Sequence, residues 1–447
     1  MSKVVRVAAG QGFWGDWLEA PVRLVEQGPI DYLALDYLAE ITMSILQKQK
    51  QADPNLGYAR DFPPLIARIA KAIRERGVTV IANAGGVNPI ACAREVVRLA
   101  PGIKVSVVLG DDVFPRLDEF LAKGYEMRDM DTREPIAPIR DRILSANAYI
   151  GAFPLAEALA SGAQVVIAGR STDTALALAP MIHRFGWQPE EYDKLAAGTI
   201  AGHIIECGAQ CTGGNCQVDW QNIPDMANIG YPIVEAEPDG SFVVTKHAGA
   251  GGRVSTDSVK EQLLYELGDP RHYITPDCVA DFTSIRLSDV GPDRVRVSGI
   301  RGAARPPSLK LSIAYTNGWK AIGTLVYSWP QALEKARAAD RIVRARLESL
   351  GLAFDEIYTE FFAVNACLGP AAPPNADPPE VQLRIGVRGA DRKAVDRFTR
   401  ELIPLVLNGP PGATGFGDGK PPVREIVAYW STLIPREEIT TRVEVIS

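Results

Sequence analysis

The stretch QVVIAGRSTDT, residues 164–174, runs from apolar, mostly β-branched residues into a polar turn, and a helical pattern follows it. The same transition recurs at four places: VVRVAAG into QGFWGD (4–16), YLALD into YLAE (32–40), VTVIA into NAGGVNP (78–89) and VSVVL into GDD (105–112). Apolar runs that alternate with helical patterns indicate parallel strands joined by helices. The strand-to-helix turns of such sheets share one edge, where ligands bind. We therefore expect the polar residues of these five turns to meet in one cleft.

This alternation predicts an α/β fold with a large N-terminal domain at residues 1–190. The near-continuous apolar strands are typical of a mostly parallel sheet with helices on both faces. Helices are expected at 17–27, 38–52, 62–76, 89–99, 114–123 and 172–184. Short alternating runs at 191–350 predict a mixed, partly antiparallel continuation that closes the site. Residues 351–447 are expected to form a small α+β domain.

Length and composition exclude several classes of protein. The chain has 447 residues, which suits two or three domains, and a formal net charge of -6. It has no Lys/Arg-rich stripe, so we expect no nucleic acid and no membrane among its partners. No apolar stretch approaches the ~20 residues of a membrane span, and the N-terminus lacks a signal-peptide pattern. A cytoplasmic protein with free cysteines, and a homo-oligomer, is expected.

The turn GRSTDTAL, residues 169–176, is the strongest candidate for anion binding. Ser171, Thr172 or Asp173 could cap the helix that follows, whose free N–H groups attract anions. Arg170 offers two parallel donors to a carboxylate or phosphate. The alternative is a helix cap beside a structural salt bridge.

Two further turns carry candidate substrate-binding residues. In NAGGVNP (83–89), Gly85 and Gly86 permit close backbone approach, Asn88 could cap a helix that starts at Pro89, and Asn83 could bind a carbonyl or hydroxyl. In GQGFWGDW (10–17), two tryptophans surround flexible glycines, and a mobile lid would carry Asp16 at its edge. Ordinary tight turns would explain the same residues.

Acidic residues follow the second and fourth predicted strands. If 37–42 is helical, Asp36 and Glu40 lie on one face, where they could transfer protons or hold a divalent metal. Asp111 and Asp112 end the fourth strand; one of them is expected to cap the next helix, which leaves the other available to a substrate. A cap and a surface acid are the structural alternative for the first pair.

The segment KHAGAGGRVS, residues 246–255, combines a histidine with a glycine-rich run. Such a run can form a backbone nest for an anion, with Arg253 beside it. His247 titrates near neutral pH and is a candidate base. A glycine-rich hairpin is the alternative.

The segment HIIECGAQCTGGNCQ, residues 203–217, contains three of the six cysteines. The spacings H-x3-C, C-x3-C and C-x4-C match no common zinc site, so we expect no metal shared by Cys207, Cys211 and Cys216. On a helix, His203 and Glu206 could face the cleft as an acid/base pair. No Walker A segment, G-x-S-x-G elbow or H-E-x-x-H motif appears in the chain.

Five stretches, in this order along the chain, resemble the acyclic terpene utilisation (AtuA-type) family. They are GQGFWGD (10–16), DYLALDYLAEITMSIL (31–46), NAGGVNP (83–89), VIAGRSTDTALALAP (166–180) and TKHAGAGGRVS (245–255). This bacterial family takes its name from catabolic operons for compounds such as citronellol and geraniol, which proceed through branched acyl-CoA intermediates. The resemblance covers most of the chain and implies a catabolic role.

The sequence and the resemblance together predict a catabolic enzyme of small carboxylic acids or acyl-CoA esters. The reaction would begin with proton abstraction next to a carbonyl and lead to hydration or dehydration, C–C cleavage or isomerisation. Arg170 would clamp an anion, Asn83 with the backbone at Gly85 and Gly86 would polarise the carbonyl, and the base would be one of Asp36, Glu40, Asp173 or His247. No organic cofactor is predicted. Two alternatives remain: a non-catalytic or scaffolding subunit of a catabolic complex, possibly with a small partner subunit, and a divalent-metal-dependent lyase that uses the Asp/Glu pairs.

Overall fold

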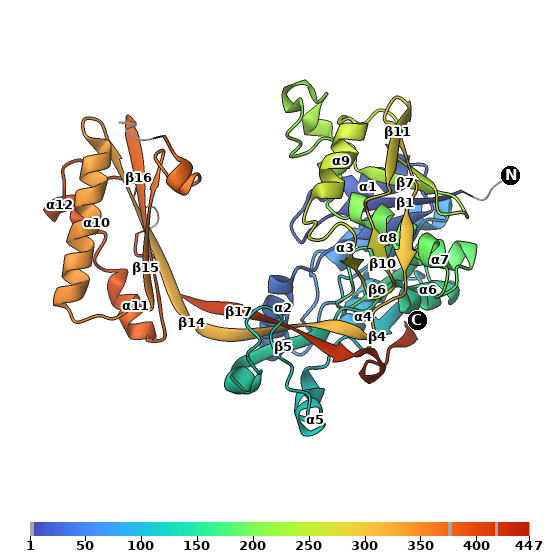
Figure 1. The fold of residues 1–447 in the computed structure, drawn as a ribbon, viewed down its shortest axis with the longest axis horizontal. Helices are drawn as coiled ribbons and strands as arrows, with labels where there is room; N and C mark the ends of the chain where they lie inside the picture. Colours follow the sequence, from blue (N-terminus) through green and yellow to red (C-terminus); the bar gives the residue numbers. More distant parts are fainter. Residues whose placement is uncertain (1–3, 374–377, 416–418, 447) are drawn as a thin grey trace. The chain divides into compact units, whose positions relative to one another are not determined.

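The chain forms two compact units in a computed structural model that describes residues 4–373, 378–415 and 419–446. The first unit comprises Met1–Ala314 and Tyr429–Ser447, and the second comprises Tyr315–Ala428 (Figure 1). The expected boundary at residue 351 differs from this division. One long strand, β14 (Ser308–Ser328), passes from the first unit into the second, and β17 (Arg424–Pro435) returns to the first.

The first unit is built on a ten-stranded sheet. The strand order is β11-β12-β8-β7-β1-β2-β3-β6-β4-β18. The strands in chain order are β1 (Val5–Gln11), β2 (Tyr32–Leu35), β3 (Thr79–Ala82), β4 (Val105–Leu109), β6 (Val165–Ala168), β7 (Pro232–Ala236), β8 (Phe242–Lys246), β11 (Arg286–Gly291), β12 (Arg294–Ser298) and β18 (Arg442–Ile446).

The sheet as a whole is mixed: strands from residues 1–190 form its parallel part, and strands from residues 191–350, where antiparallel pairing was expected, extend one edge. Its centre, β1-β2-β3-β6-β4, is parallel throughout, as the strand–helix alternation predicts. The flanking strands β7, β8, β12 and β11 pair antiparallel, and so does β18 at the other edge. The pairs β7–β8 and β11–β12 are joined by short connections, which allow only antiparallel pairing.

Helices cover both faces of the parallel centre, as expected. The helices of this unit are α1 (Glu19–Gln27), α2 (Glu40–Ala52), α3 (Phe62–Arg76), α4 (Pro89–Leu99), α5 (Leu117–Ala122), α6 (Ala152–Ala160), α7 (Ala175–Phe185), α8 (Tyr192–Ile205) and α9 (Thr256–Leu264). One face of the sheet packs in a core with α1 to α4, and the other packs in a core with α6, α7 and α8.

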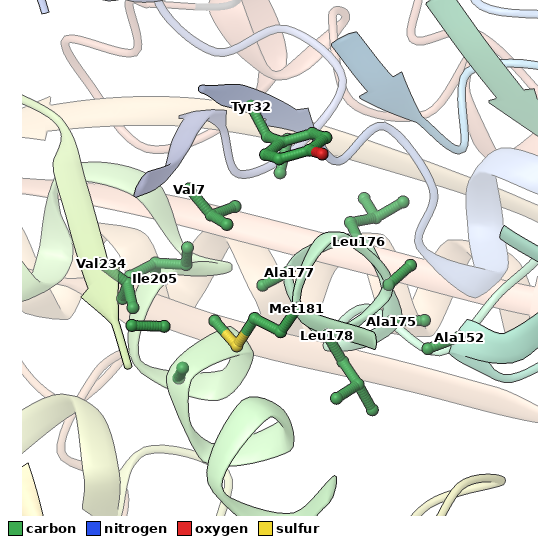
Figure 2. Close-up of a cluster of buried hydrophobic side chains, with 14 of the residues drawn as sticks. Val7, Tyr32, Ala152, Ala175, Leu176, Ala177, Leu178, Met181, Ile205 and Val234 are labelled. Atoms are coloured by element: carbon green, nitrogen blue, oxygen red, sulfur yellow. The ribbon is translucent and has the colours of Figure 1, made fainter. Parts of the chain in front are cut away.

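Alternate residues of each central strand enter the two cores. Leu33 and Leu35 of β2 face α1 to α4, whereas Tyr32 and Ala34 face the opposite core. Figure 2 shows Val7 and Tyr32 in the core to which Leu176 of α7 also belongs. Burial on both faces explains why these strands are apolar at most positions rather than at every second one.

Smaller elements complete the first unit. Strand β5 (Ile143–Ala148) pairs with β14, and β13 (Arg301–Ala303), β10 (Val279–Asp281) and β9 (Tyr273–Ile274) form a three-stranded sheet. Among the described residues, no helix is both long enough and apolar enough to cross a membrane.

The second unit has its own core between a sheet and three helices. Its sheet has the order β15-β16-β14-β17, with β15 at Glu356–Phe362 and β16 at Glu380–Gly389. The helices are α10 (Ala332–Ser349), α11 (Arg392–Phe398) and α12 (Leu405–Asn408). The unit is α+β, as expected for the C-terminal part of the chain.

Candidate functional site

A cavity of about 870 Å³ lies in the first unit, among the strand-to-helix turns. Turns after three strands of the parallel centre line it directly: Gly12 and Phe13 follow β1, Asp36 to Glu40 follow β2, and Arg170 to Asp173 follow β6. Residues Tyr149, Glu206, Cys207 and Lys310 line it from other elements. Its size falls in the usual range for small-molecule sites. Three of the five expected turns therefore line this cavity, whereas the turns after β3 and β4 contribute none of its described lining residues.

Asp36 is a buried acid in this cavity, held in place by Asn83. Its Oδ1 accepts hydrogen bonds from Asn83 Nδ2 at 2.7 Å and from Leu38 N at 3.1 Å. Asn83 Oδ1 in turn accepts from Tyr37 N at 2.7 Å. Burial, together with the nearby charge of Asp173, raises the pKa of Asp36 well above its usual value although Arg170 opposes this shift. Asp36 Oδ2 has no hydrogen-bond donor among the described residues.

Arg170 is a buried cation whose partners all belong to the protein. Its side chain is 2% exposed, and Nη1 donates to Leu38 O and, at 2.9 Å, to Asp173 Oδ1. The guanidinium lies 4.3 Å from the centroid of the Tyr149 ring. Burial disfavours its charge, but the nearby Asp173 carboxyl group, the Tyr149 hydroxyl and the carboxyl groups of Asp36 and Glu40 outweigh burial and raise the pKa of Arg170. The structural salt bridge considered as an alternative is therefore present.

Glu40 and Lys310 form a second charged pair around Tyr149. The Tyr149 hydroxyl donates to Glu40 Oε1, and Lys310 Nζ lies 3.7 Å from the same oxygen. The Lys310 ammonium also lies 4.8 Å from the Tyr149 ring centroid. Burial of Glu40 raises its pKa, but the Tyr149 hydrogen bond and Arg170 outweigh burial and hold that pKa below its usual value. Glu40 is therefore the carboxylate that stays ionised.

Glu206 and Cys207 enter the cavity from the C-terminal end of α8. Glu206 Oε1 lies 3.0 Å from His203 Nδ1, one turn earlier. Burial raises the pKa of Glu206 to about 7, although His203 lowers it. Burial also raises the pKa of the Cys207 thiol to about 12, so this cysteine is not a thiolate at neutral pH. The acid/base pair considered for His203 and Glu206 is formed, with only Glu206 lining the cavity.

The Asp36–Glu40 pair differs from its expected geometry. Residues 36–39 are extended and α2 begins at Glu40, so the two acids do not share a helical face. They line the cavity because the extended turn carries both. The candidate caps of α7 are also corrected: its N-cap is Thr174, and neither Ser171, Thr172 nor Asp173 makes a cap hydrogen bond. Asp173 pairs with Arg170 instead, and its pKa is raised by burial, against the effect of Arg170.

Several predicted binding residues lie behind the cavity wall. Asn83 is fully buried behind Asp36. A side chain on Gly85 would meet Ala168 O at 2.6 Å, and Gly86 has a φ of +52°, so both glycines serve the tight turn. Asn88 makes no cap hydrogen bond, and its Nδ2 donates to Pro54 O and Leu56 O. These residues support the site without lining it.

Asp111 and Ser171 also lie in the supporting layer. Asp111 Oδ2 accepts from Arg170 N at 2.8 Å and from Asn147 Nδ2 at 2.9 Å. Burial raises the pKa of Asp111 to about 7. Ser171 is fully buried, and its hydroxyl has no partner among the described residues. Thr172, by contrast, lines the cavity.

Asp16, His247 and Arg253 do not line the cavity. Asp16 accepts from Gly12 N at 2.9 Å and from the Tyr231 hydroxyl at 2.6 Å, so it fixes the loop after β1. His247 is buried, and burial with the adjacent Lys246 lowers its pKa. Arg253 pairs with Asp219 at 3.2 Å. The glycine-rich segment therefore contributes neither its histidine nor its arginine to this cavity.

Sequence inspection missed Tyr149 and Lys310. Tyr149 follows β5, whose residues ILSANA are less apolar than the five central strands, and the apolar α6 after it carries no amphipathic stripe. Lys310 is one lysine of an alternating strand. A strand–turn–helix pattern at 143–160 could have indicated Tyr149 as a site residue, whereas no sequence pattern indicates Lys310.

Among residues 4–373, 378–415 and 419–446, the side chains of His, Cys, Asp and Glu form no group of three or more that could hold a metal ion. The family described as "Acyclic terpene utilisation family protein AtuA" matches residues 5–445. No curated protein and no solved structure matches the chain.

Proposed function

Since this chain belongs to the acyclic terpene utilisation family AtuA, we propose that its cavity abstracts a proton next to the carbonyl of a branched acyl thioester. The observation that carries the proposal is the set of three carboxyl groups with raised pKa that line one cavity: Asp36, Asp173 and Glu206. A carboxyl group works best as a general acid or base when its pKa lies near the working pH. The overall reaction would be a lyase or isomerase reaction of catabolism.

The charges around the cavity favour a thioester over a free acid. Five acids line it, namely Asp36, Glu40, Asp173, Glu206 and Glu266, against the two cations Arg170 and Lys310. Both cations already have carboxylate partners in the protein. A substrate carboxylate would add like charge to this group, whereas a thioester carbonyl is neutral.

The apolar part of the wall suits a branched hydrocarbon chain. Its described members include Phe13, Leu38, Ile274, Leu309 and Leu433. Burial of an apolar chain against such side chains stabilises the complex by about 25 cal/mol for each Å² removed from water. The acyl group would lie on this wall while its thioester faces the carboxyl groups.

Asp36 is the base in this proposal. Its Oδ1 is fixed by Asn83 and Leu38, and Oδ2 has no hydrogen-bond donor among the described residues. Burial raises the pKa of Asp36 well above its usual value, so this carboxylate binds a proton more strongly than an exposed one. The positive charges of Arg170 and Lys310 would stabilise the enolate oxygen that develops.

Hydrogen exchange at the carbon next to the carbonyl tests this step without knowledge of the complete reaction. Wild-type protein in D₂O is expected to place deuterium at C2 of isovaleryl-CoA, which mass spectrometry detects. Asp36→Asn keeps the shape of the side chain and removes the base, so exchange is expected to fall by about 100-fold or more. Free isovalerate is expected to exchange no faster than in buffer.

Asp118→Asn is the matched control. Asp118 is exposed, with its side chain 76% accessible, and pairs with Arg140 away from the cavity lining. This variant is expected to exchange at the wild-type rate. Exchange of isovaleryl-CoA at the buffer rate in the wild type, or an unaltered rate in Asp36→Asn, would contradict the proposal.

A further inference from the structure

A second, very small cavity adjoins the carboxyl groups of the main one. Its volume is about 10 Å³, and its polar lining consists of Gln11, Asp36, Asp173 and Glu206. Asp36, Asp173 and Glu206 line the large cavity as well. The small cavity therefore lies among three acids that the large cavity presents to its ligand.

Gln11 supplies a fixed acceptor to this small cavity. Its side chain is 1% exposed, and Nε2 donates to Phe13 O at 3.0 Å. Gln11 Oε1 is buried and has no donor among the described residues. A buried acceptor without a donor is costly, and a polar space of this size accommodates about one water molecule.

Glu206 is held at this point by His203. His203 is 1% exposed, and its Nδ1 lies 3.0 Å from Glu206 Oε1 and 3.4 Å from the Tyr273 hydroxyl. The rings of Tyr273 and Phe282 pack against the imidazole with centroids 5.2 and 5.4 Å away. A ring enclosed in this way fixes the direction from which it contacts Glu206.

The other ionisable groups around Glu206 are acids, a thiol and two tyrosines. Asp173 from the turn before α7 and Glu266 from the segment after α9 disfavour its ionised form, and His203 favours it. Asp36, Cys207, Tyr265 and Tyr273 also line this side of the cavity. His203 is thus the one basic partner of Glu206 among these described groups.

We propose that Gln11 Oε1, Asp36, Asp173 and Glu206 bind one water molecule, and that Glu206 is the second acid–base group of the site, linked to Asp36 through this water. The acid–base role of Glu206 in this inference rests on the function proposed above. His203 and Gln11 act as positioning residues, His203 for Glu206 and Gln11 for the water.

The proton balance is closed within the site. The C2–H bond of the thioester breaks, its electron pair enters the enolate, and the proton forms an O–H bond with the Asp36 carboxylate. Asp36 passes a proton to the bound water, which gives another proton to the Glu206 carboxylate. Glu206 then protonates a hydroxyl on C3, the C3–O bond breaks, and water leaves as the enolate electrons form the C2–C3 double bond. No oxidant or reductant is needed.

Two probes that differ by one hydroxyl group test proton abstraction and loss of water separately. Isovaleryl-CoA can only exchange its C2 protons, whereas 3-hydroxyisovaleryl-CoA can also lose water. Glu206→Gln is expected to eliminate water from the hydroxylated probe about 100-fold more slowly than wild type, and to lose much less of its exchange of isovaleryl-CoA. Equal loss in both assays would overturn the assignment of Glu206.

The wild type distinguishes failure of this inference from failure of the proposed function. Deuterium exchange without elimination of water would overturn the relay and leave the role of Asp36 intact. Neither exchange nor elimination would contradict the proposed function, and the reaction side of this inference with it.

Gln11 tests the water site. A crystal structure of the wild type is expected to show one ordered water within hydrogen-bond distance of Gln11 Oε1. Gln11→Leu removes that acceptor, and we expect it to slow elimination about 10-fold, to shift the pH dependence of elimination and to slow exchange of isovaleryl-CoA less than elimination.

Gln164→Leu, at the start of β6, is the control for the substitution, because Gln164 Oε1 accepts from Lys104 N at 3.1 Å away from the cavity lining. This variant is expected to keep the wild-type pH profile. A dry cavity in the crystal, or an identical pH profile in Gln11→Leu, would overturn the relay.

Discussion

Arg170 holds together the acids that converge on the cavity. Its guanidinium is 2% exposed and bonds Leu38 O and Asp173, with Asp36 and Glu40 close enough to stabilise its charge. Arg170→Ala would leave these carboxyl groups without their buried cation. We expect a loss of about 3–5 kcal/mol in the free energy of unfolding, measured by chemical denaturation.

Arg68→Ala is the control for this prediction. Arg68 pairs with Glu19 at 2.6 Å, but both side chains are about half exposed, so its loss is expected to change the free energy of unfolding little. If Arg170 were instead a free clamp for an anionic ligand, Arg170→Ala would keep the wild-type stability and lose only binding. Denaturation and ligand titration of the same variant separate the two interpretations.

Asp111 makes the stability of the first unit depend on pH. Its pKa is about 7 in the folded protein, against 3.8 for an aspartate in water, because the carboxyl is buried. Between these values the folded state binds more protons than the unfolded state, so stability falls as pH rises through this window. Asp111→Asn retains an oxygen for Arg170 N and Asn147 and cannot ionise.

The melting temperature of Asp111→Asn, relative to wild type, is therefore expected to rise between about pH 4 and pH 7 and to level off above it. A relative gain of about 5 °C is expected over this window. Differential scanning fluorimetry from pH 4 to pH 9 checks it. A constant difference between the two proteins across the range would show that Asp111 keeps an ordinary pKa.

Strand β18 pairs with β4 at one edge of the large sheet, and the segment that leads into β18 passes close to Gly110. Gly110, just after β4, has a φ of +115°, and a Cβ there would lie 2.2 Å from Thr440 O. Gly110→Ala is expected to displace the segment that leads into β18. Gly102 also has a positive φ, +84°, but a Cβ there meets nothing within 4 Å.

Comparing alanine substitutions at the two glycines therefore distinguishes the cost of backbone strain from the cost of a steric overlap. Gly102→Ala is expected to cost about 1–2 kcal/mol from its φ alone. Gly110→Ala is expected to cost about 1–3 kcal/mol more, because the added methyl group overlaps the backbone of Thr440. Equal losses in thermal or chemical unfolding would show that β18 is not held closely against β4.

Elements with a strong local pattern could be predicted from the sequence, and elements defined by distant partners could not. Helices α3 and α4 have the predicted bounds, because amphipathic spacing and Pro/Gly signals mark their ends. Strand β18 was missed because its partner β4 lies more than 300 residues earlier and nothing in RVEVI indicates it. Helix α6 was missed because AFPLAEALA is apolar nearly all round.

The same distinction applies to the candidate site. Parallel strands fix where their following turns lie, so the meeting of Asp36 with Arg170 could be predicted. The direction of each side chain could not be predicted, because it depends on partners from other elements. Asn83 accepts a hydrogen bond from the Tyr37 amide. Tyr149, just after β5, and Lys310 of β14 contact Glu40.

The two compact units have separate hydrophobic cores, which predicts separate unfolding. Leu383, fully buried in the core of the second unit, shares it with residues of β14, α10, β16 and α11. Ile167 of β6 is fully buried in a core of the first unit. We expect Leu383→Ala and Ile167→Ala each to lose about 2–5 kcal/mol, in different calorimetric transitions.

The position of the cavity predicts which unfolding transition abolishes the proposed activity. All the described residues that line it belong to the first unit. Deuterium exchange into isovaleryl-CoA should therefore be lost on heating with the transition that Ile167→Ala shifts, and Leu383→Ala should leave its temperature limit unchanged. A single transition shifted by both variants would show that the two cores unfold as one, because β14 and β17, which contribute residues to both units, would then couple them.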